Sequence, residues 1–371
     1  MVIGVPKEIK TQENRIALTP FGVEHLTRLG HRVLLEHNGG AGCGFLDEDY
    51  QQVGAEVVDS PEEIFRASEL IVKVKEPQPS EIAMVQEGQV MFTYFHFAAE
   101  RELTENFRDT GATAIAYETV QTSNGELPLL MPMSEVAGRM AIQEGARMLE
   151  MNNGGRGVLL GGVPGVEPAT VTVIGGGVVG MNAAKIAAGM GANVYILDVD
   201  IERLRYLDDI MPKNVTTLYS DPVTIRELLP RTDLLVGAVL VVGAKAPKLV
   251  TRDMLQLMQK GSVIVDVAVD QGGCVETCRP TTHEDPTFIV DGVIHYCVSN
   301  MPGAVPNTST RALTNSTYPY VEKIARQGAE QAMLNDHSLL FGLNTYQRHI
   351  THRGVAEAFG LEYVEPLSLL S

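Results

Sequence analysis

The sequence predicts an α/β protein made of two doubly wound, Rossmann-like domains joined by long interdomain helices. Two series of apolar, strand-like runs alternate with helical or loop segments, one before residue 130 and one from Thr170 onward. A long helical run separates the two series, and a glycine-rich turn follows the first strand of the second one. The chain has 371 residues, which is enough for two domains that each bury a core.

Both series are recognised by short apolar runs bounded by polar residues and turn-forming residues. The strands expected in the first series are residues 2–5, 32–36, 69–74, 89–95 and 113–117. The strands expected in the second series begin at Thr170 and lie near Val194, Leu234, Val263 and Thr287, with helical stretches such as residues 252–259 between them.

The segments around the second series set the expected domain boundaries. Ser134 is expected to cap the interdomain helix that follows it, because a serine side chain can accept a hydrogen bond from the first turn. After Pro306 the pattern is helical, without further strands, and we expect this tail to pack on the first domain. The first domain would then consist of residues 1–130 and 307–371, and the second of residues 131–306.

Residues 171–198 predict a dinucleotide-binding βαβ unit. An apolar strand leads into a turn with Gly175, Gly177 and Gly180, followed by a helix of small residues, a second strand and then Asp198. These glycines permit the tight turn, the approach of the backbone to a pyrophosphate, and close packing of the helix on the strand. An acid at the end of the second strand accepts hydrogen bonds from ribose hydroxyls and repels a 2′-phosphate. The expected cofactor is therefore NAD rather than NADP.

Two arginines bear on that choice of cofactor. Arg203 and Arg205 lie beyond Asp198, and either side chain is long enough to reach a 2′-phosphate. Their position past the acid favours a place beside the adenine or in solvent instead, so the expectation of NAD is kept.

The composition excludes several other classes of protein. Hydrophobic residues make up 44% of the chain, charged residues 20%, and the formal net charge is −17, which disfavours nucleic acids and anionic membranes as partners. The opening MVIGVPKE does not resemble a signal segment, and the longest uncharged apolar run, residues 234–244, is too short to span a bilayer. Four cysteines without a zinc-type spacing indicate reduced thiols in the cytoplasm, and no metal site is expected.

The chain resembles the alanine dehydrogenase family along essentially its whole length. The opening IGVPKEIKTQENRIALTP is similar to the signature shared by alanine dehydrogenases and the NAD-binding part of nicotinamide nucleotide transhydrogenases. The further segments that resemble alanine dehydrogenases are VKVKEP, YFHFA, MSEVAGRMA, GGVPGV, VDVAVDQGG and SNMPGAVPNTST. The resemblance implies reversible, NAD-dependent oxidative deamination of L-alanine to pyruvate and ammonium by a homohexamer.

The resemblance also implies roles for four residues near predicted strand ends. Arg15 is expected to clamp the substrate carboxylate through paired hydrogen bonds, with Lys75 as its partner at the carboxylate or the carbonyl oxygen. Lys73 points the same way by alternation, but the family motif places substrate binding at the later lysine. His96 and Asp270 are expected to exchange protons with the substrate, because the reaction must deprotonate an ammonium group and an added water.

Further positions resemble cofactor contacts of the family, many of them through backbone groups. They are Ser134, Gly175, Gly177, Val178, Val179, Gly180, Asp198, Arg203, Ser220, Val239, Leu240, Val267, Ala268, Val269, Asp270, Arg279, Val298, Ser299, Asn300 and Met301. Asp266 has apolar strand neighbours and is expected to bind nearby backbone instead. Lys323 and Gln327 stand where some family members carry an acid and a histidine that hold a divalent ion, and neither suits a hard cation.

Three alternative functions follow from the same motifs. The NAD-binding component of a transhydrogenase shares the opening signature but needs no acid/base pair such as His96 and Asp270. An opine-forming or saccharopine-type dehydrogenase would use an amino acid in place of ammonia. An NAD-sensing module would keep the fold without turnover, which the presence of Lys75, His96 and Asp270 argues against.

Overall fold

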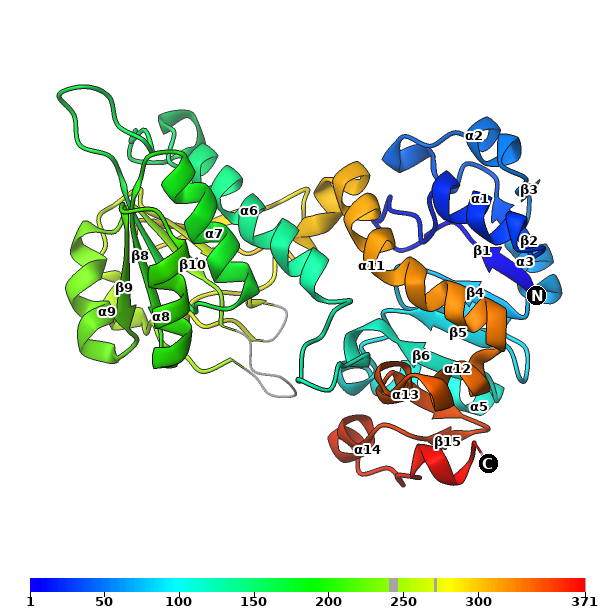
Figure 1. Cartoon of the computed structure of the whole chain (residues 1–371). Helices are drawn as coiled ribbons and strands as arrows, with labels where there is room; N and C mark the ends of the chain where they lie inside the picture. Colours follow the sequence, from blue (N-terminus) through cyan, green and yellow to red (C-terminus); the bar gives the residue numbers. More distant parts are fainter. Residues whose placement is uncertain (240–245, 270–271, 371) are drawn as a thin grey trace. The chain divides into compact units, whose positions relative to one another are not determined.

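The computed structural model describes residues 1–239, 246–269 and 272–370 (Figure 1). The chain forms two compact units, which we call unit 1 (Met1–Met133 with Val305–Ser371) and unit 2 (Ser134–Ala304). Each unit contains one sheet in which parallel strands dominate, so the predicted α/β class with two Rossmann-like sheets is confirmed. Within the described ranges, no helix combines the length and the hydrophobicity that crossing a membrane requires.

Unit 1 has an eight-stranded sheet in the order β15-β14-β6-β5-β4-β1-β2-β3. Its strands are β1 (Val2–Val5), β2 (Arg32–Glu36), β3 (Glu56–Val58), β4 (Leu70–Val72), β5 (Val90–Thr93), β6 (Thr113–Ala116), β14 (Leu343–Tyr346) and β15 (His349–Ile350). Strands β1 to β6 pair in parallel, and β14 pairs antiparallel with both β6 and β15. The chain adds β2 and β3 on one side of β1 and then returns to place β4 on its other side, so the strand order reverses there.

Helices cover both faces of this sheet. They are α1 (Pro20–Arg28), α2 (Asp47–Gln52), α3 (Pro61–Ala67), α4 (Pro79–Ile82), α5 (Arg101–Thr110), α11 (Pro306–Gln327), α12 (Ala329–Asn335), α13 (His337–Phe341) and α14 (Arg353–Phe359). One core cluster joins the sheet to α1, α11 and α12, and a second joins the opposite face to α3, α5 and α14.

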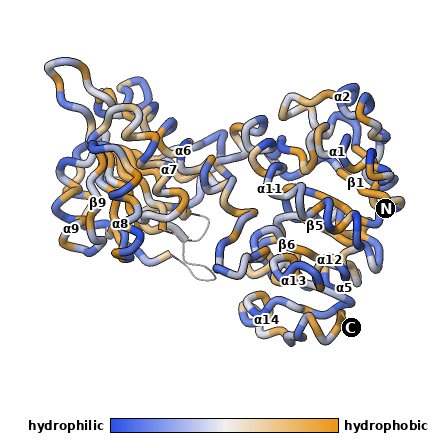
Figure 2. The backbone as a smooth tube through the Cα atoms, in the orientation of Figure 1, coloured by the Kyte–Doolittle hydropathy of each residue, from blue (hydrophilic) through white to orange (hydrophobic). Residues whose placement is uncertain are grey.

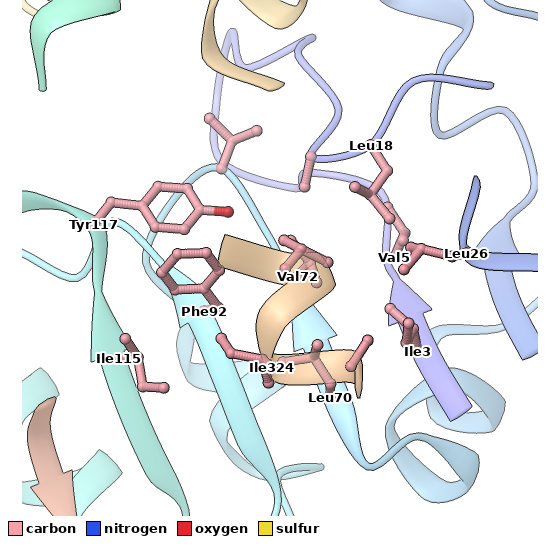
Figure 3. Close-up of a cluster of buried hydrophobic side chains, with 14 of the residues drawn as sticks. Ile3, Val5, Leu18, Leu26, Leu70, Val72, Phe92, Ile115, Tyr117 and Ile324 are labelled. Carbon is pink, nitrogen blue, oxygen red and sulfur yellow. The ribbon is translucent and has the colours of Figure 1, made fainter. Parts of the chain in front are cut away.

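The strands of unit 1 alternate between these two clusters, as the two-residue period of a strand requires. In β4, Leu70 and Val72 belong to the cluster under α11, and Ile71 belongs to the opposite one. Figure 3 shows Ile324 of α11 in the same cluster as Leu70, Val72 and Phe92. The tail that begins at residue 305 therefore supplies α11 and α12 to one helical layer of unit 1, beside α1, and α14 to the other.

Unit 2 repeats the order of the first five strands of unit 1. Its seven-stranded sheet runs β12-β13-β11-β10-β7-β8-β9, with all pairs parallel except β12 with β13. The strands are β7 (Thr170–Ile174), β8 (Asn193–Asp198), β9 (Val215–Tyr219), β10 (Leu234–Gly237), β11 (Val263–Asp266), β12 (Thr287–Val290) and β13 (Val293–Tyr296). Here the order reverses between β7 and β10.

The remaining helices belong mainly to unit 2. They are α6 (Met131–Met148), α7 (Val178–Gly189), α8 (Ile201–Ile210), α9 (Pro222–Leu228) and α10 (Arg252–Leu255). A core cluster joins α9 and α10 to one face of the sheet, and α7 packs on β7, β8 and β10. Figure 2 shows hydrophobic segments concentrated in the strands of this sheet, with hydrophilic segments on the surrounding helices and loops.

Several local expectations are wrong. The tail after Pro306 is not helical throughout, because β14 and β15 form a hairpin whose turn holds Gln347 and Arg348 at positive φ. That turn lacks the glycine or asparagine that usually marks such a hairpin, so the sequence pattern concealed it. Ser134 does not cap α6, because the helix already begins at Met131. The helix expected over residues 252–259 ends at Leu255.

A buried cluster of charges lies at the end of β4. The Lys73 side chain is fully buried, and its Nζ lies 3.1 Å from Glu8 Oε2 and 2.7 Å from Glu81 Oε1. Burial alone lowers the pKa of Lys73, but the two carboxylates outweigh it and raise the pKa. Lys73 therefore stays charged and has a structural role, which differs from the substrate-binding role expected of Lys75.

We predict that Lys73→Met destabilises unit 1, because the change leaves two buried carboxylates without their cation. Breaking a buried ion pair by removing one partner costs about 3–5 kcal/mol. The expected fall in Tm is on the order of 10 °C, measured by calorimetry. Lys7→Met is the matched control, since Lys7 is exposed. A Lys73→Met protein as stable as the control would contradict this account.

Candidate active site

The candidate site residues of unit 1 follow three neighbouring strands, β1, β4 and β5. Arg15 lies in the loop after β1, as expected, while Lys75 and His96 lie three residues beyond the ends of β4 and β5. The expected strands 69–74 and 89–95 were therefore too long at their carboxyl ends. Because parallel strands end at the same edge of a sheet, the three residues share the edge where doubly wound sheets bind ligands.

The guanidinium of Arg15 is buried and oriented by Glu13. Arg15 Nε donates to Glu13 Oε1 at 2.7 Å and Nη2 donates to Oε2 at 2.6 Å, while Nη1 lies 2.9 Å from Met133 Sδ. Burial alone raises the pKa of Glu13, but the hydrogen bonds and charge of Arg15 outweigh it and lower that pKa to about 2. The pair therefore stays ionised, and the guanidinium is fixed in one orientation.

The ammonium of Lys75 lies within electrostatic range of Arg15. Burial and the charge of Arg15 both lower the pKa of Lys75, and Glu76 opposes them. Two cations held near each other at a partly buried edge are a candidate binding site for an anion, because a carboxylate would relieve their mutual repulsion.

His96 is exposed and has an unusual backbone conformation for a residue with a side chain. Its φ is 54° and its ψ is 35°, which places it in the left-handed region. The imidazole stacks on Tyr94 with ring centroids 5.7 Å apart and an interplanar angle of 4°. Tyr94 is itself buried, and its hydroxyl donates to the carbonyl of Leu129. The imidazole is therefore supported on one face and open to solvent.

A glutamate holds the backbone N–H at each of these three positions. Glu13 Oε1 accepts from Arg15 N at 3.1 Å, Glu8 Oε1 accepts from Lys75 N at 3.3 Å, and Glu118 Oε1 accepts from His96 N at 2.5 Å. Lys75 and His96 lie just beyond their strands, where the N–H has no ladder partner and needs another acceptor, and the N–H of Arg15 in its loop has the same need. These three glutamates were not identified from the sequence.

Only one of these glutamates has a local signal in the sequence. Glu13 precedes Arg15 by only two residues, which is a usable signal for an ion pair. Glu8 and Glu118 are separated from Lys75 and His96 by 67 and 22 residues, so only the fold brings them together. Tyr94 belongs to the family-like segment YFHFA, but its stacking on His96 requires the observed backbone turn.

The glycine turn of unit 2 has the geometry expected of a dinucleotide-binding turn. Gly175 has a φ of 101°, and a Cβ on Gly180 would lie 1.8 Å from the Gly175 carbonyl oxygen. A Cβ on Gly177 would meet nothing within 4 Å, so the space in front of the α7 N-terminus is open. These residues fit a pyrophosphate at that helix end.

Asp198 ends β8 beside this turn. Its Oδ2 accepts from Gly176 N at 2.6 Å, and its Oδ1 accepts from Asp200 N at 2.9 Å. Arg203 lies neither in solvent nor free of the turn, because its Nε donates to the Gly176 carbonyl at 2.6 Å. Arg205 instead pairs with Glu202 at the surface. Of the two places expected for Arg203, free solvent is therefore excluded, and a place beside the adenine stays a prediction.

The other family-like cofactor positions gather largely at the carboxyl edge of the second sheet. Ser220 follows β9, Val239 follows β10, residues 267–269 follow β11 and residues 298–301 follow β13. Ser134 lies within α6, and Arg279 is exposed with its guanidinium 4.4 Å from the centre of the Phe288 ring. Leu240 and Asp270 lie outside the described residues.

Two further expectations concern structural residues. Asp266 is buried and accepts backbone hydrogen bonds from Ala268 at 3.0 Å and Val275 at 3.1 Å, which confirms the expected backbone-binding role. Burial raises the pKa of Asp266. Lys323 forms an ion pair with Asp336, and Gln327 Oε1 accepts from Asn335 Nδ2 at 2.8 Å.

Unit 2 is a Rossmann-type unit with a glycine turn and an acid, Asp198, at the end of its second strand. Unit 1 has a partly buried edge with two cations and a histidine that stacks on Tyr94. Together these features define a nucleotide-dependent oxidoreductase. The family model described as "Alanine dehydrogenase/PNT, N-terminal domain" matches residues 4–137, and the one described as "Alanine dehydrogenase/PNT, C-terminal domain" matches residues 141–353. The chain therefore belongs to the alanine dehydrogenase family.

Individual relatives match over nearly the whole chain. Alanine dehydrogenase of Halomonas elongata is 55% identical over 370 residues, covering 100% of both chains. Alanine dehydrogenase of Methanococcus maripaludis is 56% identical over 98% of both chains. A solved L-alanine dehydrogenase is 54% identical with a TM-score of 0.94, covering 97% of this chain and 99% of its own. A transhydrogenase from Sinorhizobium meliloti, 23% identical with a TM-score of 0.81 over 95% of this chain and 99% of its own, shares the fold.

We predict that Gly180→Ala abolishes tight dinucleotide binding, because its Cβ would collide with the Gly175 carbonyl and displace the turn. The expected result is at least a tenfold weaker Kd for NADH, or about 1.4 kcal/mol, measured by fluorescence titration. Gly189→Ala is the control on the same helix, since its Cβ would meet nothing within 4 Å. Equal NADH affinity in both variants would show that the close contact at Gly180 is not needed.

Proposed function

We propose that this chain catalyses the reversible, NAD-dependent oxidative deamination of L-alanine to pyruvate and ammonium. The observation that carries the proposal is the match to alanine dehydrogenases over the full length of the chain. The cationic edge at Arg15 and Lys75, with His96 nearby, supports it, because the substrate brings one carboxylate and the reaction moves protons.

Arg15 and Lys75 are proposed to bind the substrate carboxylate or the carbonyl oxygen. The Glu13 pair supports this role, since it fixes the guanidinium before substrate arrives and so limits the conformational freedom lost on binding. Lys75 adds a second positive charge whose pKa is lowered by burial and by Arg15. An anion bound there would favour the charged form of the lysine.

His96 is proposed as the general acid/base, with Asp270 as the second. In the oxidative direction, His96 would take the proton of the alanine ammonium and release it to solvent. It would later take a proton from the water that adds to the iminium carbon and give it to the departing ammonia. In the reverse direction these transfers would run backwards. The stack on Tyr94 supports this role by limiting rotation of the ring.

The glycine turn and Asp198 are proposed to hold NAD. When bound there, NAD would supply the hydride acceptor for the oxidation of the alanine Cα. The carboxylate of Asp198 supports NAD over NADP, because a 2′-phosphate brought near it would be repelled. Arg203 keeps its positive charge while its Nε donates to the Gly176 carbonyl, so the proposed preference for NAD rests on Asp198.

The resemblance to alanine dehydrogenases further supports a homohexamer that acts in the cytoplasm and takes no nucleic acid or membrane as partner. The formal net charge of −17 is consistent with this. Light scattering of the purified protein measures the oligomer directly, and a monomer mass would reject the hexamer.

We predict that the purified protein forms NADH from L-alanine and NAD, and consumes NADH with pyruvate and ammonium, followed by absorbance. NADP, D-alanine, larger amino acids and the omission of an amino acid are the parallel reactions, and each should give much lower rates. His96→Ala should lower kcat by about 100-fold or more, because it removes the acid/base group. Tight NADH binding without turnover of L-alanine would overturn the proposed reaction.

We also predict that pyruvate binds the enzyme–NADH complex more weakly as the pH rises toward the ordinary lysine pKa of about 10.4. The pKa of Lys75 is lowered, so its positive charge is lost at a lower pH than that of a free lysine. The expected loss of affinity approaches about tenfold, which is the value of one charged hydrogen bond. NADH fluorescence without ammonium measures this binding and avoids the titration of the second substrate.

The control for this pH dependence is Lys75→Arg. A guanidinium stays charged throughout this range, so the variant's pyruvate affinity should change much less with pH. Burial raises the pKa of Tyr94, which keeps its phenol protonated over the same interval. A pH profile that is equally steep in Lys75→Arg would assign the titration to another group.

A further inference from the structure

We propose that Glu118 is a positioning residue for His96. Its carboxylate holds the backbone of His96 in the left-handed conformation from which the imidazole stacks on Tyr94. The inference rests on the proposed function for the role of His96, and it adds a residue on which that role depends.

The first support is the backbone of the segment that carries His96. Strand β5 ends at Thr93, and the chain then turns so that His96 adopts a φ of 54°. Residues with a Cβ rarely occupy this region, and they keep such a conformation only when surrounding contacts hold it. The N–H groups of Phe95 and His96 no longer have partners in the sheet and need acceptors.

The second support is that Glu118 supplies both acceptors. Its Oε1 and Oε2 each lie 3.2 Å from Phe95 N, and its Oε1 lies 2.5 Å from His96 N. Two adjacent N–H groups thus point at one carboxylate, which is a strong, charge-assisted arrangement. Among the residues that the structure describes, Glu118 forms no ion pair within 4 Å, and its hydrogen bonds all go to these two N–H groups. Its charge also acts on His352, where it opposes the lowering of the pKa by burial.

The third support is the rigidity of the segment that carries Glu118. It lies in the short helix η3 (Tyr117–Thr119) directly after β6. Tyr117 packs edge-on against Phe92 and Tyr94, with ring centroids 4.4 and 5.0 Å apart, and Figure 3 shows it beside Phe92 in the core. On the other side, Asn344 Nδ2 donates to Thr119 Oγ1 at 2.7 Å.

These contacts connect Glu118 and His96 through one rigid unit. Tyr94 supports the imidazole of His96 and also packs on Tyr117, the neighbour of Glu118. Glu118 then fixes the backbone of His96 from the adjacent strand end. Contacts with the same aromatic residues, Tyr94 and Tyr117, therefore set the position of both the imidazole ring and the backbone of His96.

The test compares E118A and E118Q with the wild-type enzyme, and E126A serves as the matched control because Glu126 is exposed. In E118A, kcat for L-alanine should fall about ten- to hundredfold, as expected for a misplaced catalytic group. The KM for L-alanine and the Kd for NADH should stay within about twofold, because Arg15, Lys75 and the glycine turn are untouched. E118Q should recover much of kcat, since its amide oxygen can still accept one of the two N–H groups.

A purely structural role would give a different pattern. It would lower the Tm and change KM and NADH affinity along with kcat, without rescue in E118Q. E118A with the kcat of E126A would overturn the proposal. If E118A does not fold, E118Q decides, because its weaker neutral acceptor should still lower kcat measurably.

Hydrogen exchange gives a readout that does not depend on activity. The amides of Phe95 and His96 should exchange faster in E118A, and to a lesser extent in E118Q, than in the wild type and E126A. A fall in kcat without faster exchange at these two amides would overturn the positioning role. A wild-type protein that does not oxidise L-alanine would refute the proposed function, and the exchange result would still decide whether Glu118 holds this segment.

Discussion

The arrangement of the site in unit 1 depends on one constraint, which is that backbone N–H groups beyond the end of a strand must find new acceptors. At Arg15, Lys75 and His96 the acceptor is in each case a glutamate carboxylate. A carboxylate binds N–H groups more strongly than a neutral acceptor does, so each loop is fixed in a defined conformation. The sheet thus ends in ordered segments rather than in flexible loops.

Two of these glutamates also balance the charge of this edge. Glu13 is paired with Arg15, and Glu8 with the buried Lys73, so these two cations are stable in the interior. Lys75 differs from them, because burial and Arg15 lower its pKa. An incoming carboxylate would supply the negative charge that favours its ionised form. The two lysines that follow β4, Lys73 and Lys75, are thereby distinguished by their partners rather than by their residue type.

The sequence predicted the parts of the fold that follow from local pattern. The alternation of strands and helices, the first two strands and the glycine turn with Asp198 are all local features, and the structure has them. The hairpin of β14 and β15 escaped because its turn uses Gln347 and Arg348 at positive φ, where composition gives no signal. Glu118 escaped because its contact with His96 arises from the parallel pairing of β5 and β6 and not from spacing along the chain.

The order of the segments along the chain has a consequence for biosynthesis. Unit 2 is continuous in sequence, whereas unit 1 is built from both ends of the chain. Its strand β6 needs β14 as a partner, and Asn344 reaches Thr119 across 225 residues of sequence. On the ribosome, all of unit 2 is synthesised before the last strands of unit 1 and its helices α11 to α14. The N-terminal part of unit 1 therefore has an incomplete core until the rest of the chain is made. Apolar surface exposed at that stage is the kind of surface that chaperones bind.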